Sequence, residues 1–185
     1  MISSLKYLKS MKILIISNSR SGSTNLMKSI SSYYDIPCIF EPFKDETPVD
    51  VEGDVIIKTL INHHTYEFFY HFAGYFDKVI LLSRRDIIAM SESLYWVSKK
   101  WEEDNYDEHS DYHLSEYSFD ENINITEERI YQKVKDRIDK LERLSEELNI
   151  PLDYYEDIYY GTKTLKDTDI GLDMKFLDNT LKLRK

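Results

Sequence analysis

The chain is poor in the residues that would support several common kinds of protein. It has one cysteine, Cys38, so it can form no internal disulfide and no zinc site built from several cysteines. No apolar run approaches the roughly 20 residues needed to cross a bilayer, and residues 13–16 are too short for the apolar core of a signal peptide. These absences predict a soluble protein of a reducing, cytoplasmic compartment with no membrane partner.

Positive charge is also scarce. The 24 Lys and Arg are outnumbered by 34 Asp and Glu, and the net charge of −10 argues against nucleic acid as a partner. A small ligand with several negative charges would need a local positive pocket, so the well-placed Arg and Lys residues are informative. The scarcity of Gly and Pro beside abundant Tyr, Ile, Lys and Asn is typical of a bacterial or viral genome rich in A and T.

The length of 185 residues suits one domain, 1–185, with a real core. Met11 stands directly before the first apolar run, so residues 1–10 are expected to be a flexible extension. Several runs are continuously apolar, as in parallel strands that are covered on both faces. Strands are predicted at 12–17, 36–40, 54–59, 78–83 and 152–155, and helices at 65–75, 86–101 and 122–149.

The first predicted strand leads into a small polar turn, Ser17 to Thr24, and then into a helical pattern from Leu26. A strand, a tight turn and a helix N-terminus in succession point a row of backbone N–H groups at an anion. The turn therefore predicts a phosphate site. The fold class that it indicates is α/β, a single domain in which helices flank a parallel sheet as in the P-loop-containing NTPases.

The turn lacks the lysine of a Walker A loop, G-x-x-x-x-G-K-[ST]. When that pattern is laid over the turn, Gly22 is followed by Ser23 in place of the lysine, and the nearest cation is Arg20. No later apolar strand ends in an evident Asp for Mg²⁺. Because phosphoryl transfer depends on that lysine and that metal, a divergent nucleotide kinase is the alternative rather than the leading hypothesis.

Residues 20–26, Arg-Ser-Gly-Ser-Thr-Asn-Leu, resemble the 5′-phosphosulfate loop of sulfotransferases that use 3′-phosphoadenosine-5′-phosphosulfate. In that family a Lys or Arg opens a Ser/Thr/Gly-rich turn after the first strand. Arg20 would also stabilise charge on the departing phosphate oxygen. An ordinary serine-rich turn is the alternative. The resemblance implies that the donor is bound by Arg20, Ser21, Gly22, Ser23, Thr24 and Asn25.

Residues 78–95 resemble the 3′-phosphate motif of the same family, in which a strand ends in Arg and a Ser follows eight positions later on the next helix. Arg85 and Ser93 have this spacing, and segments 84–86 and 93–95 are similar to the bacterial carbohydrate sulfotransferase branch. The resemblance implies that Arg85 and Ser93 bind the 3′-phosphate. It also implies a carbohydrate hydroxyl as acceptor and no metal.

Candidates for the base that takes the acceptor proton lie near two predicted strand ends. Glu41 follows one strand and resembles the Glu that precedes an aromatic residue in the bacterial carbohydrate branch. Lys58, a further catalytic candidate, resembles the Lys-Thr that ends a strand in sulfotransferases. Leu60 stands where one branch has its catalytic histidine, and His63 and His64 come later. Glu41 is the preferred base, with His63 or His64 as the alternative.

Residues 102–122 contain nine Asp and Glu, no Lys or Arg, and interleaved aromatic residues with His109 and His113. This segment is either an acidic loop or a lid whose aromatic residues stack on a sugar. The two histidines lack a scaffold that would predict a metal. Residues 155–158 resemble a Tyr-Glu-Asp-Leu segment late in the sulfotransferases, but the final glycine-rich cofactor loop of the family is not recognisable.

The sequence therefore predicts a sulfotransferase. The alternatives are the divergent nucleotide kinase and a non-catalytic binding protein that retains the fold and engages a partner through residues 102–122. The sequence predicts neither the identity of the acceptor nor the oligomeric state.

Overall fold

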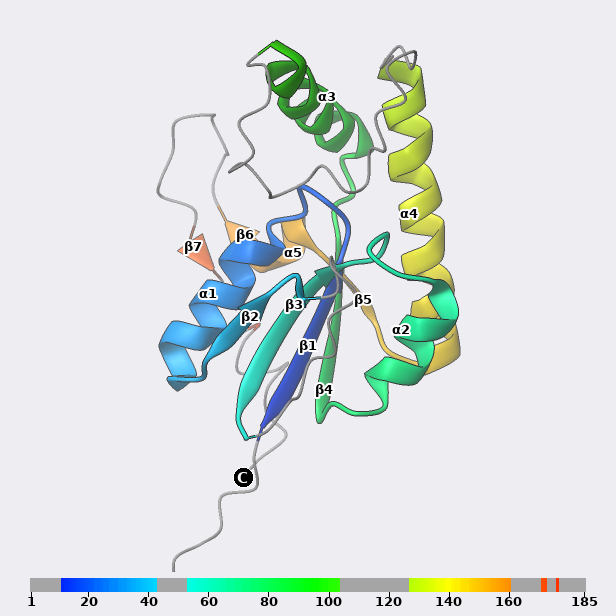
Figure 1. Cartoon of the computed structure of the whole chain (residues 1–185). Coiled ribbons are helices and arrows are strands. Elements are labelled where there is room, and N and C mark those ends of the chain that lie inside the picture. The colour runs from blue at the N-terminus through cyan, green and yellow to red at the C-terminus, as the bar shows by residue number, and fades with distance from the viewer. Residues whose placement is uncertain (1–10, 43–52, 104–126, 161–170, 173–175, 177–185) are drawn as a thin grey trace, which may run out of the picture.

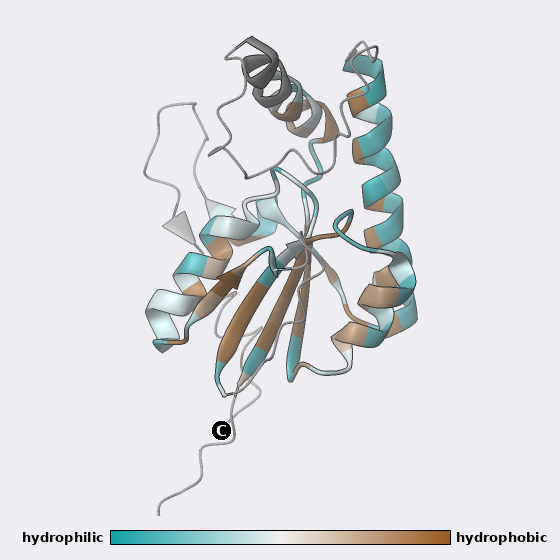
Figure 2. Ribbon diagram, in the orientation of Figure 1, coloured by the Kyte–Doolittle hydropathy of each residue, from teal (hydrophilic) through white to brown (hydrophobic). Residues whose placement is uncertain are grey.

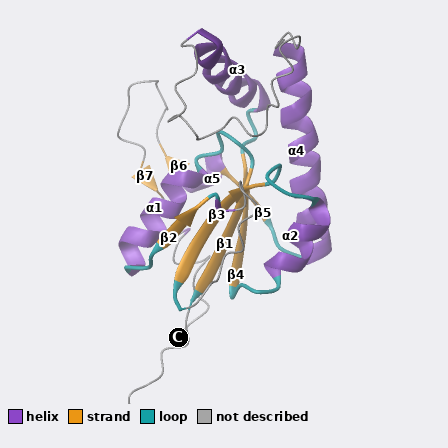
Figure 3. Ribbon diagram, in the orientation of Figure 1, coloured by secondary structure: helices purple, strands orange, loops and turns teal. Residues whose placement is uncertain are grey.

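A parallel five-stranded sheet forms the centre of the molecule. The computed structural model describes residues 11–42, 53–103, 127–160, 171–172 and 176 (Figure 1). The strands lie in the order β2-β3-β1-β4-β5 and all neighbours are parallel, which confirms the predicted sheet (Figure 3). Their bounds are β1 (Lys12–Ser17), β2 (Cys38–Phe40), β3 (Val55–Leu60), β4 (Lys78–Ser83) and β5 (Leu152–Tyr154).

Helices cover both faces of the sheet, and together they make a single α/β domain. Because side chains alternate along a strand, β1 sends Ile13 and Ile15 to one face and Leu14 and Ile16 to the other. The first pair packs with α1 (Ser23–Tyr34) and α5 (Tyr155–Ile158). The second pair packs with α2 (Tyr66–Ala73) and α4 (Glu127–Leu148). Figure 2 shows the apolar strands in brown and α4 with hydrophilic residues, in teal, along most of its length.

Helix α3 (Ile87–Glu103) and the first half of α4 extend beyond the carboxyl edge of the sheet (Figure 1). They hold each other through an apolar cluster of their own. In this cluster Met90 and Leu94 of α3 are buried together with Ile130 and Val134 of α4. The two packed helices therefore lie beside the edge where the strands end.

The observed boundaries differ from the predicted ones by a few residues. The second strand begins at Cys38 rather than at residue 36, because the Ile36 N–H closes the end of α1 by donating to the Ser31 carbonyl at 3.2 Å. Asp35, in a left-handed conformation with φ 54°, makes that helix end. The antiparallel pair β6 (Tyr159–Tyr160) and β7 (Gly171–Leu172) was not predicted, since two-residue strands leave no periodic pattern.

Several expectations fall outside the described residues. They concern the extension 1–10, the start of the long helix at 122–126, and the acidic segment apart from residues 102 and 103, which belong to α3. Within the described ranges, no helix is long and apolar enough to span a membrane.

Candidate functional site

The ends of β1, β3 and β4 meet at one level of the sheet. Ser17 pairs with Leu60 on one side and with Leu82 on the other. β2 and β3 lie on one side of β1, and β4 and β5 lie on the other. The order in which the strands are added to the sheet therefore changes direction at β1. The carboxyl edge beside such a reversal is where open α/β sheets bind ligands.

The turn after β1 is built on two residues with positive φ, Arg20 at 63° and Gly22 at 80°. Gly22 is also the N-cap of α1. A Cβ atom at Gly22 would lie 2.7 Å from the ring of Tyr155, and the Tyr159 hydroxyl donates to the Gly22 carbonyl at 2.9 Å. Both the backbone conformation and the two tyrosines therefore require glycine here.

Hydrogen bonds inside the turn fix its shape. The Ser17 hydroxyl donates to the Ser23 hydroxyl at 2.8 Å, and the Ser21 hydroxyl donates to the Asn18 carbonyl at 2.7 Å. The Asn18 amide donates in turn to the Val134 carbonyl of α4 at 3.3 Å. Since Ser21 is fully buried and its hydroxyl is engaged, its contact with an anion would have to come from its backbone N–H.

A pocket of about 160 Å³ lies between this turn and the end of β3. It is lined by Ser19, Arg20, residues 22–25, Lys58 and Leu60. Five of the six residues predicted to bind the donor therefore line one cavity, together with Lys58 from a different strand. Two cationic side chains at a helix N-terminus make this pocket suited to an anion.

Arg20 connects the turn to α3. Its Nε–H donates to the Ser93 hydroxyl at 2.8 Å, although 73 positions separate the two residues. Partial burial of the guanidinium, and then the charge of Arg84, lower the pKa of Arg20 from its ordinary value. A bound anion would offset both effects by favouring the charged form of Arg20.

Arg85 makes its contacts elsewhere. Its two terminal nitrogens donate to the Asp157 carboxylate at 2.6 and 2.5 Å, and its guanidinium lies 4.3 Å from the centre of the Tyr154 ring. The hydrogen bonds to Asp157 raise the pKa of Arg85, and those from Arg85 lower the pKa of Asp157. In the described part of the chain Ser93 accepts a hydrogen bond from Arg20, and Arg85 pairs with Asp157 and not with Ser93.

Glu41, Lys58 and His63 form a buried cluster where β2 and β3 end. The Lys58 ammonium donates to Glu41 Oε1, and the side chains of both residues are almost wholly buried. His63 Nε2 lies 3.8 Å from Glu41 Oε2, the other carboxylate oxygen. Glu41 has a positive φ of 46°, and its N–H donates to the Lys58 carbonyl at 2.7 Å. Glu41, the preferred candidate for the base, and His63, one of the two alternatives, thus occupy one site.

His64 belongs to the start of α2 instead. Its Nδ1 accepts the Thr65 N–H at 3.0 Å, and its ring stacks on Phe68 with 3.8 Å between the ring centres. Thr65 is the N-cap of α2, where its side chain accepts the Phe68 N–H. The structure therefore gives His64 a role in forming this helix end.

Two residues beside the turn were missed by the sequence analysis. Arg137 of α4 is 6% exposed and donates to the Ser19 hydroxyl at 3.1 Å. Its place next to Ile138 on the apolar stripe of α4 was the signal that could have found it. Asn62 follows β3, and both polar atoms of its amide are buried with no hydrogen-bond partner in the part of the chain that the structure describes. Nothing in the sequence pattern marks Asn62.

The described residues contain no group of three or more His, Cys, Asp and Glu side chains arranged to hold a metal ion. His109 and His113 lie outside those ranges. Comparison of the chain with protein-family models, with curated proteins and with solved structures finds no match.

Proposed function

We propose that the chain is a sulfotransferase that moves a sulfuryl group from 3′-phosphoadenosine-5′-phosphosulfate to an acceptor hydroxyl group. The acceptor that we propose is a carbohydrate. The observation that supports this most is the 2.8 Å hydrogen bond from Arg20 to Ser93. It joins the two segments that resemble the phosphate-binding motifs of that family. On this proposal the fold is of the P-loop-containing NTPase type.

The residues of the pocket suit the phosphosulfate end of the donor. The cavity offers the Arg20 and Lys58 cations, the hydroxyl of Thr24 and the N-terminus of α1. Its volume of about 160 Å³ is smaller than the ~300–1,000 Å³ of pockets that enclose a whole drug-sized ligand. The adenosine would therefore lie outside it. Arg85 and Ser93 remain the candidates for the 3′-phosphate.

When bound, the donor supplies an activated sulfuryl group. The acceptor hydroxyl oxygen would form a bond to sulfur while the bond from sulfur to the bridging oxygen breaks, releasing adenosine 3′,5′-bisphosphate. Arg20 and Lys58 would offset the negative charge that develops on the bridging oxygen. The hydroxyl proton would go to Glu41, or to His63 oriented by Glu41.

Lys58 also supports the second candidate function, a nucleotide kinase. Its side chain lines the pocket from β3, so it could take the place of the Walker A lysine that the turn lacks. A kinase would need Mg²⁺, whereas the sulfotransferase reaction needs none. The requirement for Mg²⁺ therefore separates the two functions.

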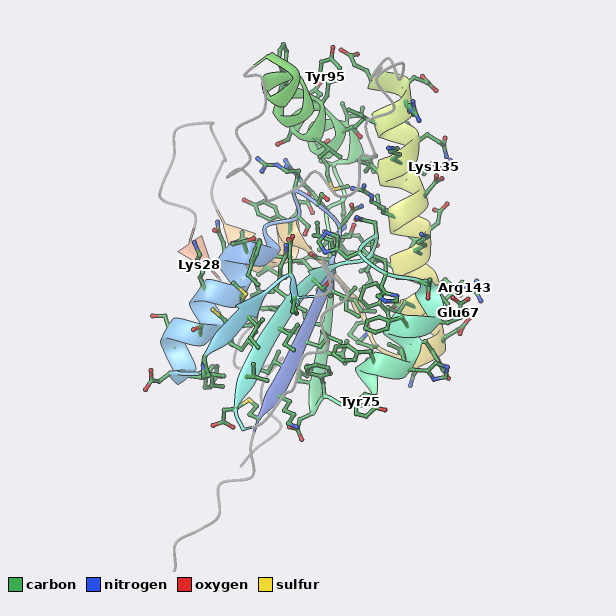
Figure 4. The ribbon with its side chains drawn as sticks, in the orientation of Figure 1. Lys28, Glu67, Tyr75, Tyr95, Lys135 and Arg143 are labelled. Carbon is green, nitrogen blue, oxygen red and sulfur yellow. The ribbon has the colours of Figure 1, made fainter. Side chains whose placement is uncertain are left out.

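The proposal is tested by incubating the protein with the sulfuryl donor and a set of carbohydrates and following release of adenosine 3′,5′-bisphosphate. Arg20→Ala should lower kcat more than it raises the KM for the donor, because charge on the departing oxygen develops only in the transition state. Lys28→Ala is the control, since Lys28 is an exposed cation on α1 (Figure 4). An effect of Arg20→Ala on KM alone would make Arg20 a binding residue.

A further inference from the structure

A second cavity, of about 380 Å³, lies between α3 and the first turns of α4 and shares no residue with the pocket beside the turn. Its size falls within the range of pockets that take small molecules. The buried side chains of Met90, Leu94 and Ile130 hold the two helices together. The cavity therefore lies between the two helices that extend beyond the carboxyl edge of the sheet.

Three aromatic side chains line this cavity, Tyr95 and Trp96 from α3 and Tyr131 from α4. Trp96 is 68% exposed and Tyr131 is 39% exposed. The rings of Tyr95, labelled in Figure 4, and Trp96 are edge to face, with 5.7 Å between their centres. Large aromatic residues left this accessible in a cavity offer flat apolar surfaces, and the faces of their rings attract cations.

Three carboxylates line the same cavity. Glu92 comes from α3, and Glu127 and Glu128 come from the first turn of α4. Within the described ranges no hydrogen bond or ion pair engages any of these three side chains. The cavity therefore combines ring faces with three carboxylates that form no ion pair within the described part of the chain.

Ser91 gives an independent indication of a ligand. It lines the cavity, it is only 7% exposed, and its hydroxyl has no hydrogen-bond partner among the described residues. A buried hydroxyl left unpaired is unfavourable, and such groups in folded proteins nearly always have a partner. A molecule that fills the cavity and carries a hydrogen-bonding group would supply that partner.

We propose that the cavity between α3 and α4 binds a small organic cation, an ammonium group on a hydrocarbon body that also carries a hydroxyl. The ammonium would meet the carboxylates of Glu92, Glu127 and Glu128, and the hydrocarbon would lie against Trp96 and Tyr131. The hydroxyl would pair with Ser91. This site goes beyond sulfuryl transfer and does not depend on it.

Choline tests the proposal, because it is a quaternary ammonium with a hydroxyl. Trp101→Phe leaves Trp96 as the single tryptophan of the chain, so its fluorescence reports on the cavity. Choline should change that fluorescence saturably at constant ionic strength, with sodium chloride as the reference salt. The uncharged analogue of the same shape, 3,3-dimethylbutan-1-ol, should bind at least about tenfold more weakly. Equal binding of the two, or no binding of choline, would overturn the proposal.

Substitutions in the same background locate the site. The triple variant Glu92→Gln, Glu127→Gln and Glu128→Gln should weaken choline at least about tenfold, since it removes the opposing charges. Glu146→Gln, at an exposed position further along α4, is the matched control and should leave choline binding unchanged. A triple variant that binds choline as the parent does would place the cation elsewhere and overturn the proposal.

The hydroxyl contact is tested separately. Ser91→Ala should weaken choline by about three- to tenfold, the effect of one lost hydrogen bond. The same substitution should leave tetramethylammonium unaffected, because that cation has no hydroxyl. A loss of equal size for both cations, or none for choline, would contradict the assignment of Ser91 and with it the proposed ligand.

Discussion

His63 Nε2 lies 3.8 Å from Glu41 Oε2, while Glu41 Oε1 accepts a hydrogen bond from Lys58. Glu41 and His63, two of the candidates for the base, therefore lie next to each other, and Lys58 holds the other oxygen of the Glu41 carboxylate. A carboxylate so placed can accept the proton itself, or it can orient the imidazole that does. In either case Glu41 and His63 should behave as one unit.

Variants of this unit give the first prediction. Glu41→Gln should lower kcat by roughly 10²–10⁴ while donor binding survives, because the residues that line the donor pocket include Lys58 but not Glu41. The double variant Glu41→Gln with His63→Ala should be about as slow as the slower single variant. His64→Ala is the control and should stay near wild-type activity, since Thr65 and Phe68 engage its ring.

Steady-state kinetics of the four variants test whether Glu41 and His63 act as one unit. If the effects of Glu41→Gln and His63→Ala multiply, the two residues act independently and the common unit is disproved. If both single variants keep full activity, the acceptor does not meet this cluster.

Gly22→Ala should destabilise the protein more than Gly53→Ala does. Both glycines have positive φ, 80° and 75°, so both substitutions carry the same backbone cost of about 1 kcal/mol. At Gly22 the new Cβ would overlap the Tyr155 ring at 2.7 Å, whereas at Gly53 no atom of the described residues lies within 4 Å. Urea unfolding should show a further loss of about 1–3 kcal/mol for Gly22→Ala. Equal losses would mean that the tyrosines move aside.

Arg85→Ala should weaken adenosine 3′,5′-bisphosphate by about 2–3 kcal/mol and leave a ligand without the 3′-phosphate almost unaffected. For this to occur, Arg85 must exchange its bond to Asp157 for one to the phosphate. Arg84→Ala is the comparison, because Arg84 is the arginine whose charge acts on Arg20. Titration calorimetry that finds the selective loss in Arg84→Ala would transfer the 3′-phosphate to Arg84.

The stability of the protein should depend on pH through Asp153. Burial raises the pKa of Asp153 to about 6 from an ordinary value of 3.8. The folded state thus binds the Asp153 proton more tightly than the unfolded state does. The contribution of this group to the stability of the protein is therefore lost as the pH rises from about 4 through 6. Asp153→Asn should therefore gain stability relative to wild type by about 1 kcal/mol between pH 5 and pH 8. Urea unfolding at the two pH values measures this, and an unchanged difference would contradict the raised pKa.

The sheet was predictable because each strand is a short apolar run that ends in polar residues. The runs at 12–17 and 78–83 match β1 and β4 to the residue, since both faces of a parallel strand are buried and the pattern stops where burial stops. The strand order was not predictable from periodicity, because it depends on which crossovers pack best. The pair β6 and β7 was missed for want of any pattern.

The candidate site was predictable in its parts and not in its contacts. The sequence indicated Arg20 and residues 21–25 as the donor-binding turn and Lys58 as a catalytic candidate, and all of these except Ser21 line one pocket. It gave no sign that Ser93 would meet Arg20 in place of Arg85, because helix α3 leaves the sheet at an angle that tertiary packing sets. The proximity of Glu41 to His63 was not predictable either, because it depends on tertiary structure: the register of β2 against β3 places the end of β2 beside Lys58.

Calorimetric titration with adenosine 3′,5′-bisphosphate and with ATP, each with and without Mg²⁺, tests the central claim most directly. A sulfotransferase should bind the bisphosphate equally well in the absence of Mg²⁺, bind ATP at least about tenfold more weakly, and lose affinity for the bisphosphate in Arg20→Ala. Binding of ATP that requires Mg²⁺, with no binding of the bisphosphate, would contradict the account and make the nucleotide kinase the better description.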